Sequence, residues 1–192
     1  MAMNKDAIIT LPHASLRQRS RRVGLITPEI RALANDMEAA TLDWEDSREH
    51  ELGVALAAVQ IDKLWRVVVI RSDFDDKEDR TFEVFINPEI TKYEGALEED
   101  YEGCLSVAIV YGLVPRHTKV RVKAKNLEGK EVRLTAEGFL ARVFQHELDH
   151  LHGTLFIDHI KDRPDAFFQL QANGKLKALD YEKDIKENSI LW

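Results

Sequence analysis

The chain has 192 residues, of which 44% are hydrophobic and 32% charged, and this composition fits one globular domain with a sizeable core. Its 27 basic and 34 acidic residues give a net charge of −7, which argues against a general nucleic-acid binder, because such proteins present a basic surface. No apolar run approaches the length of a membrane span, no secretory signal is expected, and the single cysteine, Cys104, excludes an internal disulfide. We therefore expect a cytoplasmic protein with neither a membrane nor a specific nucleic acid as partner.

The first 24 residues are expected to form an arm that lies over the body of the protein. The arm contains a cluster of four arginines: Arg17, Arg19, Arg21 and Arg22. Such clusters most often form a solvated or salt-bridged face. Thr27-Pro28-Glu29 then marks a helix start, with a hydroxyl N-cap, a proline in the first turn and an acid near the positive end of the helix dipole. Apolar residues keep helical spacing to about Asp46, which predicts a helix that covers the core.

The segment 53–61 reads Gly-Val-Ala-Leu-Ala-Ala-Val-Gln-Ile and combines small residues with one polar side chain in an apolar run. One interpretation is a buried strand that carries an incidental glutamine. The other is a backbone that passes close to a ligand, with the amide of Gln60 as a positioned hydrogen-bond donor. The segment alone does not distinguish the two.

Two segments rich in β-branched and aromatic residues, 65–71 and 82–86, predict strands. The acidic run 72–81 between them lacks the ligand spacing of an EF-hand and is expected to be an exposed loop. Residues 120–125 and 131–135 alternate in polarity around an Asn-Leu-Glu-Gly turn, which predicts a hairpin.

The segment 145–150 reads Gln-His-Glu-Leu-Asp-His and dominates the functional interpretation. Side chains four residues apart lie on the same face of a helix, one turn apart, so His146 and His150 can bind one metal ion. Glu147 projects from nearly the same face. This is the pattern of zinc hydrolases, but it supplies only two protein ligands.

A catalytic site of this kind usually needs a third protein ligand as well as a position for water. In the metzincin pattern a third histidine would stand where this chain has Phe156, so that arrangement is excluded. A downstream glutamate, such as Glu182 or Glu187, is an alternative. His152 is a poor rival because it lies well round the helix, whereas the thiolate of Cys104 is a strong ligand for iron or zinc.

The remaining elements complete the expected fold. We expect the metal helix to begin at Thr135 or Ala136 and to stop at Gly153, a natural C′ residue. A further helix, with a mixed-charge tail, is expected in about residues 164–192. The predicted class is α+β, with mixed and antiparallel strands around the central His-Glu-x-x-His helix and with N-terminal and C-terminal helices. Residues 1–192 are expected to form a single catalytic domain.

Three motifs occur in order, at residues 53–60 (Gly-Val-Ala-Leu-Ala-Ala-Val-Gln), 102–106 (Glu-Gly-Cys-Leu-Ser) and 145–153 (Gln-His-Glu-Leu-Asp-His-Leu-His-Gly). Together they resemble the peptide deformylase family, whose first motif is Gly-x-Gly-Leu-Ala-Ala-x-Gln. The second and third motifs match the family in full, and the first matches in all but one fixed position. The resemblance extends from the N-terminal arm to about Ile160.

The resemblance implies an enzyme that removes the formyl group from the N-terminal formylmethionine of new polypeptides and releases formate. It implies that Cys104, His146 and His150 hold one divalent metal ion, natively Fe(II), with zinc, nickel or cobalt as substitutes. The implied partners are N-formylmethionyl peptides, including nascent chains at the ribosome.

The resemblance also assigns roles around the metal. Glu147 is implied as the general base, and the Gln60 amide and the Leu105 backbone N–H as donors to the oxyanion. Other positions match the substrate pocket or the groups that orient the site: Gly53, Val54, Ala55, Glu102, Gly103, Phe139, Val143 and Gln145. Asp149 either joins these orienting groups or makes a pair on the helix surface.

The chain departs from the family pattern at a few positions. Ala55 replaces a glycine, Ala108 a common proline, and Tyr111 a common arginine that would contact substrate. None of these changes a ligand, the base or an oxyanion donor, so we expect an active enzyme with an altered substrate preference. Two other hypotheses are a silent paralogue that binds formylated N-termini and a metallopeptidase, although the metallopeptidase explains neither Cys104 nor Gln60.

Overall fold

A computed structural model describes residues 3–189 and 191–192, and its centre is a seven-stranded antiparallel sheet. The strands follow the order β1-β2-β3-β4-β6-β7, and β5 also pairs with β4. The strands are β1 Ala55–Ala57, β2 Val67–Arg71, β3 Phe82–Cys104, β4 Val107–Lys125, β5 Glu131–Glu137, β6 Phe167–Leu170 and β7 Leu176–Ala178. The α+β class predicted from the sequence is confirmed.

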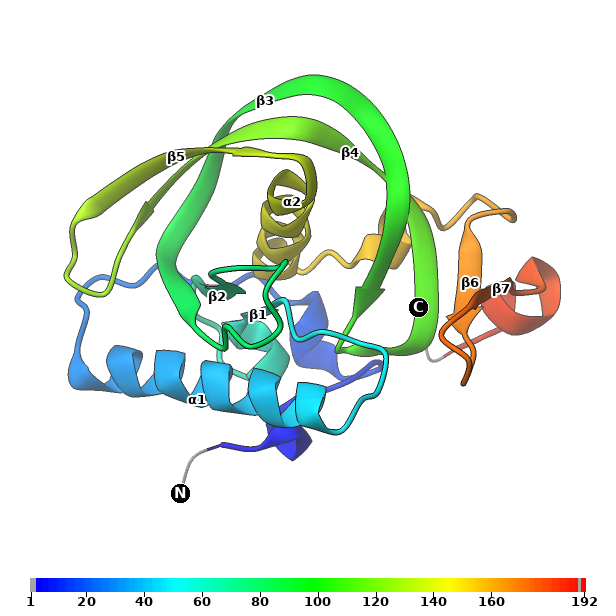
Figure 1. Cartoon of the computed structure of the whole chain (residues 1–192), viewed down its shortest axis with the longest axis horizontal. Helices are drawn as coiled ribbons and strands as arrows, with labels where there is room; N and C mark the ends of the chain where they lie inside the picture. The colour runs from blue at the N-terminus through cyan, green and yellow to red at the C-terminus, as the bar shows by residue number, and fades with distance from the viewer. Residues whose placement is uncertain (1–2, 190) are drawn as a thin grey trace.

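Strands β3 and β4 are far longer than the segments predicted for them, and they arch over the helix α2, Gly138–His152 (Figure 1). Register shifts interrupt their pairing, including one between Glu94 and Leu97 and one between Glu102 and Cys104. Such bulges bend and twist a strand. The bent ribbon wraps around α2 and brings the end of β3 back beneath it.

The N-terminal helix α1, Pro28–Asp46, has the bounds predicted from its start signal and apolar spacing. Its buried residues, which include Leu33 and Met37, pack against Leu56 of β1 and Val69 of β2. Five short helical segments complete the elements: 3-10 helices Lys5–Ala7, Ala14–Arg17, Ala58–Ile61 and Phe156–His159, and a π-helix Tyr181–Lys186. Helix α1 therefore covers one face of β1 and β2, as Figure 1 shows.

Helix α2 begins at Gly138, so the predicted start at Thr135 or Ala136 is wrong. The reason is that β5 continues through these residues, with Thr135 opposite Arg121 and Ala136 opposite Val120 of β4. The predicted end of the helix at Gly153 is confirmed.

At that stop, Gly153 is the C-cap, with a φ of 78° in the left-handed region. A Cβ atom there would lie 2.5 Å from the carbonyl oxygen of Arg17 in the arm, so the position requires glycine.

The helix expected in residues 164–192 is not found in the part of the tail that the structure describes. The hairpin β6–β7 stands there instead, followed by the π-helical turn Tyr181–Lys186. Phe167 is fully buried, and an Asn173-Gly174 turn joins the strands, which is a hairpin signal. Strand propensity and burial of the phenylalanine outweigh the mixed-charge pattern of the tail.

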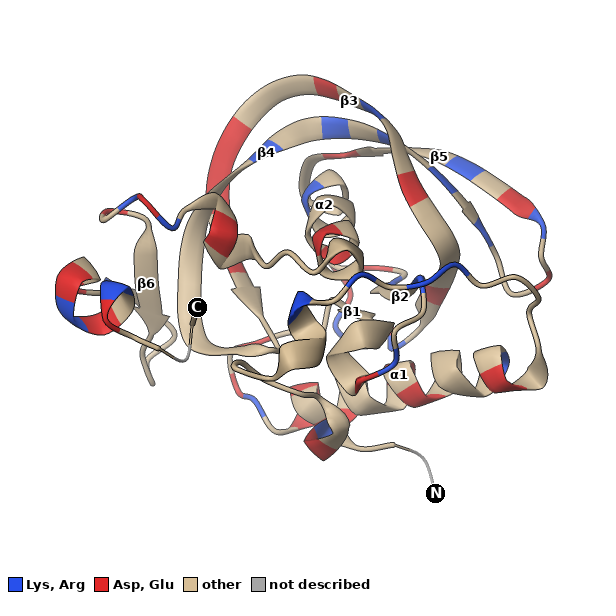
Figure 2. Ribbon diagram, turned by 180° about the vertical axis from the view of Figure 1, so that it is seen from behind, with Lys and Arg blue, Asp and Glu red and all other residues tan. Residues whose placement is uncertain are grey.

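The N-terminal arm lies across the body, as expected, with residues 1 and 2 outside the described part. Arg17 pairs with Asp158 at 2.6 Å, and Arg22 pairs with Glu89. Figure 2 shows basic and acidic residues on neighbouring strands β3, β4 and β5. Cross-strand ion pairs, such as Lys119 with Glu137 at 2.7 Å, neutralise this surface. Among the described residues, no helix combines the length and the apolarity that crossing a bilayer requires.

A buried ion pair fixes the connection between α1 and β1, which precedes the first motif. The guanidinium of Arg71 is fully buried and pairs with the Glu45 carboxylate, which also accepts the backbone N–H of Gly53 at 2.8 Å. The Arg71 Nε donates to the Gly53 carbonyl at 3.3 Å. Helix α1, strand β2 and residue 53 are therefore joined through one carboxylate.

We predict that Glu45→Ala lowers the free energy of unfolding by about 3–5 kcal/mol, because it leaves the Arg71 charge buried without its partner. Urea denaturation measures this change. The matched control is Asp46→Ala, which breaks the exposed pair with Arg80 and should leave unfolding nearly unchanged. Equal effects of the two substitutions would contradict the prediction.

Candidate metal centre

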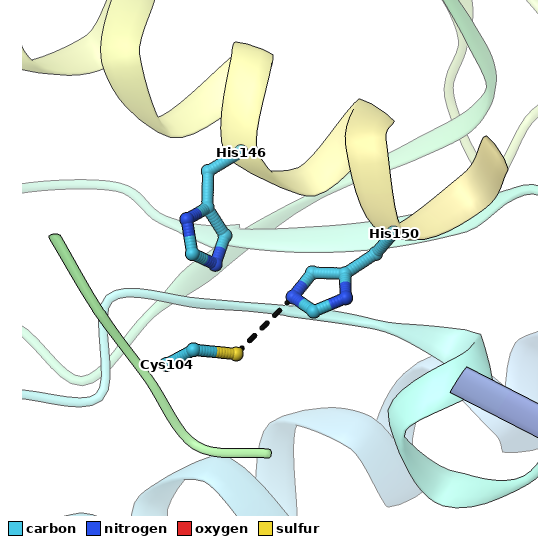
Figure 3. A group of neighbouring side chains, drawn as sticks. All are labelled: Cys104, His146 and His150. Atoms are coloured by element: carbon cyan, nitrogen blue, oxygen red, sulfur yellow. Dashed lines mark hydrogen bonds between the residues drawn. The ribbon is translucent and has the colours of Figure 1, made fainter. Parts of the chain in front are cut away.

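Helix α2 and the end of β3 bring three metal-binding side chains together. His146 and His150 lie one turn apart on α2, and Cys104, the last residue of β3, faces them from below (Figure 3). The Cys104 Sγ lies 3.3 Å from the His150 Nε2. One ligand atom from each residue lies within 4.8 Å of the others. The side chains predicted as ligands are thus brought to one point.

The donor set and its spacing fit one divalent metal ion. At ordinary metal–sulfur and metal–nitrogen distances, two ligands of a tetrahedral ion lie roughly 3.3–3.6 Å apart. The separation between Cys104 and His150 is in this range. One thiolate and two imidazoles suit iron, zinc, nickel or cobalt. The alternative third ligands do not approach the site: Glu182 is in the tail, paired with Lys186, and His152 contacts Arg66.

A buried carboxylate orients the first histidine ligand. The His146 Nδ1 donates to the Glu102 Oε2 at 2.9 Å, which leaves its Nε2 for the metal. Burial disfavours the ionised form of Glu102, but hydrogen bonds from His146 and Arg116 lower the pKa of this carboxyl well below its usual range. Arg116 donates two of these bonds, and Arg142 adds a fourth hydrogen bond to the carboxylate, to Oε1 at 2.9 Å. Glu102 therefore stays ionised and holds the imidazole in one tautomer.

Two other residues of the third motif support the helix from outside the cavity. Asp149 accepts hydrogen bonds from Arg116 at 2.6 Å and from His159 at 2.7 Å, which favours the orienting role considered for it over a surface pair. The Gln145 side chain bonds both backbone groups of His117 on β4, at 2.8 and 3.0 Å. Gln145 thus fixes α2 against the sheet and does not line the cavity.

Glu147 follows the first ligand and borders the cavity beside it. Its side chain is buried, and its Oε2 has no hydrogen-bond partner within the part of the chain that is described. Burial raises the pKa of this carboxyl to about 7. A carboxyl group with this pKa can both accept and donate a proton near neutral pH.

Gln60 lies in the 3-10 turn that follows β1, so the interpretation of the segment as one buried strand holds only for Ala55–Ala57. Its Oε1 accepts the Ala57 backbone N–H at 2.8 Å, which directs the amide NH₂ the other way. That NH₂ donates to the Ser106 hydroxyl at 3.1 Å and lies 3.6 Å from the Cys104 Sγ. The amide is thus a fixed donor beside the metal ligands.

A cavity of about 280 Å³ adjoins these groups. Most of the residues predicted for the site line it: Val54, Ala55, Gln60, Glu102, Gly103, Cys104, Leu105, Phe139, Val143, His146 and Glu147. Gly53 does not line the cavity and instead holds the backbone through Glu45. The cavity has an apolar side and a side with the donors and the carboxylate, as a site for a small ligand usually has.

Sequence reasoning missed several residues that build the site. Arg116 and Arg142 are buried charges that hold Glu102, and they come from elements separated from it by 14 and 40 residues. The partner of Tyr111 was also missed: its hydroxyl donates to the Glu51 carboxylate at 2.5 Å. Two arginines in apolar segments were the available signal, because buried arginine usually requires a carboxylate partner.

Comparison with known proteins agrees with this geometry. A model of the polypeptide deformylase family matches residues 5–165. The peptide deformylase of Thermomicrobium roseum is 43% identical over 159 residues, which cover 81% of this chain and 86% of the relative. Peptide deformylase 1 of Pseudomonas syringae pv. tomato is 42% identical over 156 residues, with 81% and 86% covered.

Solved structures give the same result. The peptide deformylase of Synechococcus elongatus in complex with actinonin superposes with a TM-score of 0.73 at 37% identity, covering 81% of this chain and 80% of that one. The enzyme of Legionella pneumophila superposes with a TM-score of 0.70 at 39% identity, covering 82% and 86%.

We predict that Glu102→Gln weakens metal affinity by about 10–100-fold, because the amide cannot hold the His146 imidazole as the carboxylate does. Competition with a chelating dye measures the affinity. Glu98→Gln, an exposed change on the same strand, is the control and should bind metal as the unmodified protein does. If both variants kept full affinity, the orienting role of Glu102 would be refuted.

Proposed function

The chain belongs to the peptide deformylase family of metal-dependent hydrolases, and from this premise we propose that it deformylates the N-terminal formylmethionine of newly made polypeptides. The observation that carries the proposal is the Glu147 carboxyl. It is buried, lacks a partner at Oε2 among the described residues, and borders the cavity that also contains Cys104 and His146. A general base and a metal centre thus face one small-ligand cavity.

The proposed reaction cleaves the bond between the formyl carbon and the amine nitrogen of methionine. A divalent metal ion held by Cys104, His146 and His150 supplies Lewis acidity that makes water nucleophilic at neutral pH. Glu147 takes a proton from the attacking water and passes it to the departing nitrogen as that bond breaks. Formate and a free methionyl N-terminus are the products.

Negative charge develops on the formyl oxygen during this attack, and nearby N–H groups stabilise it. The Gln60 amide is suited to this role because Ala57 fixes its orientation and its NH₂ lies on the side of Cys104. Leu105 lines the same cavity, and its backbone N–H is the proposed second donor.

The methionine side chain is proposed to occupy the apolar side of the cavity. Val54, Phe139 and Val143 line this side, and Ala55 places a methyl group where the family pattern has none. We further propose Fe(II) as the native metal, nascent chains at the ribosome as substrates and the cytoplasm as the compartment. The thiolate ligand supports iron, although nickel, cobalt and zinc suit the same donors.

We predict that anaerobically prepared protein, loaded with iron or nickel, releases formate from formyl-Met-Ala-Ser. Cys104→Ala should lose the metal, because the two histidines alone leave the ligand set incomplete. A formate assay and metal analysis measure the two outcomes. Absence of formate from the metal-loaded protein would refute the proposed function, and full metal content in Cys104→Ala would refute the ligand assignment.

Glu147→Gln is expected to keep the metal and to lower kcat by about 10²–10⁴-fold, because the amide can neither accept nor donate the proton. Metal analysis and steady-state kinetics test this. Glu137→Gln, an exposed change at the end of β5, immediately before the same helix, is the matched control. Unchanged turnover in Glu147→Gln would contradict its role as the base.

Gln60→Glu is expected to lower kcat by about 10²–10³-fold, because the donor to the oxyanion is lost. The carboxylate still accepts the Ala57 N–H, but it is buried in place of a neutral amide, so a lower melting temperature is also expected. Kinetics are therefore measured well below the melting temperature of the metal-loaded variant. Unchanged kcat under these conditions would contradict the role of Gln60 as a donor.

A further inference from the structure

The β6–β7 hairpin lies outside residues 5–165, which the family model matches, and its Leu170, Gln171 and Ala172 line a hollow beside the cavity. Strand β6 pairs with the first half of β4, where Tyr111 of β4 lies directly opposite Phe168 of β6. The Phe168 ring packs edge-on against Tyr101, with centroids 5.0 Å apart, and Tyr101 lines the cavity. The C-terminal hairpin is therefore attached to the wall of the active site.

A second hollow, of about 560 Å³, adjoins the first. Both are lined by the same set of residues at their junction: Trp44, His50, Glu51, Cys104, Leu105 and Tyr111. The second hollow then runs on to Leu170, Gln171 and Ala172 of the hairpin. The metal ligand Cys104 thus lies next to a groove, and the hairpin forms part of the wall of that groove.

Tyr111 and Glu51 form the junction between the two hollows. The Tyr111 ring lies so close to Gly103 that a Cβ atom there would be 2.6 Å from it, and its hydroxyl donates to Glu51 on the α1–β1 loop. Burial raises the pKa of Tyr111, so the hydroxyl stays a donor. The pair links β4 to the α1–β1 loop and lies on the boundary between the two hollows.

The hairpin turn meets the same loop farther out. A Cβ atom on Gly174 would lie 3.5 Å from the His50 ring, so the turn and the α1–β1 loop are in near contact. Residues 171–175 close the turn through two backbone hydrogen bonds, each 2.9 Å, between Gln171 and Lys175 and between Gly174 and Gln171. The α1–β1 loop and the hairpin turn therefore lie against each other, and both line the groove.

One wall of the groove also presents an apolar side chain in an unusual conformation. Ile109 lines the groove, is 63% exposed and has a φ of 59°. β-Branched residues rarely adopt this left-handed region, and such outliers gather at binding sites. The backbone thus directs an isoleucine towards solvent at the place where a bound chain would pass.

The charges of the groove do not favour a strongly charged ligand. The two basic residues of the lining, Lys5 and Arg48, stand against three acidic ones, Asp6, Glu49 and Glu51, so only one negative charge is in excess. The other lining residues include Ile8, Val107 and Leu170. An extended peptide with small or apolar side chains suits this surface. The groove opens from the metal cavity, so the matching occupant is the part of a substrate that follows its first residue.

We propose that the β6–β7 hairpin is a recognition element, which binds the substrate residues that follow formylmethionine and so favours longer formylated peptides over short ones. This inference rests on the proposed deformylase function. Neither the family match nor the metal site assigns any role to the hairpin.

The test compares kcat/KM of the nickel-loaded full chain for formyl-Met-Ala and for formyl-Met-Ala-Ser-Val-Leu. We expect the longer peptide to be favoured about tenfold, because one or two additional buried apolar groups are sufficient for that difference. Ala172→Trp, a change in the exposed turn that fills the groove, should abolish the preference by raising KM for the longer peptide. Leu170→Ala should reduce the preference for the longer peptide.

Lys177→Trp is the matched control, because it places the same side chain on an exposed part of the hairpin that does not line the groove. It should keep the preference. Metal content and melting temperature are measured for each variant. Equal kcat/KM for the two peptides in the unmodified protein, or equal effects of both tryptophans, would overturn the hairpin inference alone. Formate release from neither peptide would overturn the proposed function.

Discussion

The site depends on one buried negative charge, the carboxylate of Glu102. It accepts hydrogen bonds from the guanidinium groups of Arg116 and Arg142 and from the imidazole of His146. These partners come from β4 and α2, while Glu102 belongs to β3, so one carboxylate joins the elements that carry the metal ligands. A buried charge is costly unless hydrogen bonds satisfy it, and here both oxygens are used. Cys104 follows two residues later on the same strand, so its position depends on the same bonds.

This arrangement explains why the metal site lies on regular elements although β3 is long and bent. The bulge between Glu102 and Cys104 turns the end of the strand towards α2, and the network through Arg116 to Asp149 and His159 holds the helix from the other side. Ligands held by packed elements keep their geometry better than ligands on loops. Glu147 can then remain buried without a partner at Oε2 among the described residues, since the surrounding structure does not depend on its hydrogen bonds.

What could be predicted from the sequence is what local spacing determines. His146 and His150 are one helical turn apart, the start of α1 follows from the proline and the acid in its first turn, and the stop follows from Gly153 as the left-handed C-cap. The network around Glu102 could not be predicted in this way. Its arginines lie 14 and 40 residues away and acquire their partner only through the register of β3 with β4 and the docking of α2.

The C-terminal hairpin shows the same limit more sharply. Strand β4 is paired with β3 along most of its length, but β5 covers its other edge only from Lys119 onwards. The stretch Val110 to Gly112 would present an open edge, and β6 pairs with it. The tail becomes a strand because this edge must be covered and because Phe167 is buried there. No periodicity within the tail reports which edge of a distant sheet stays open, so a helix was the natural local interpretation. The same pairing sets the hairpin beside Tyr111, which is why a segment outside the family motifs lines the groove next to the metal cavity.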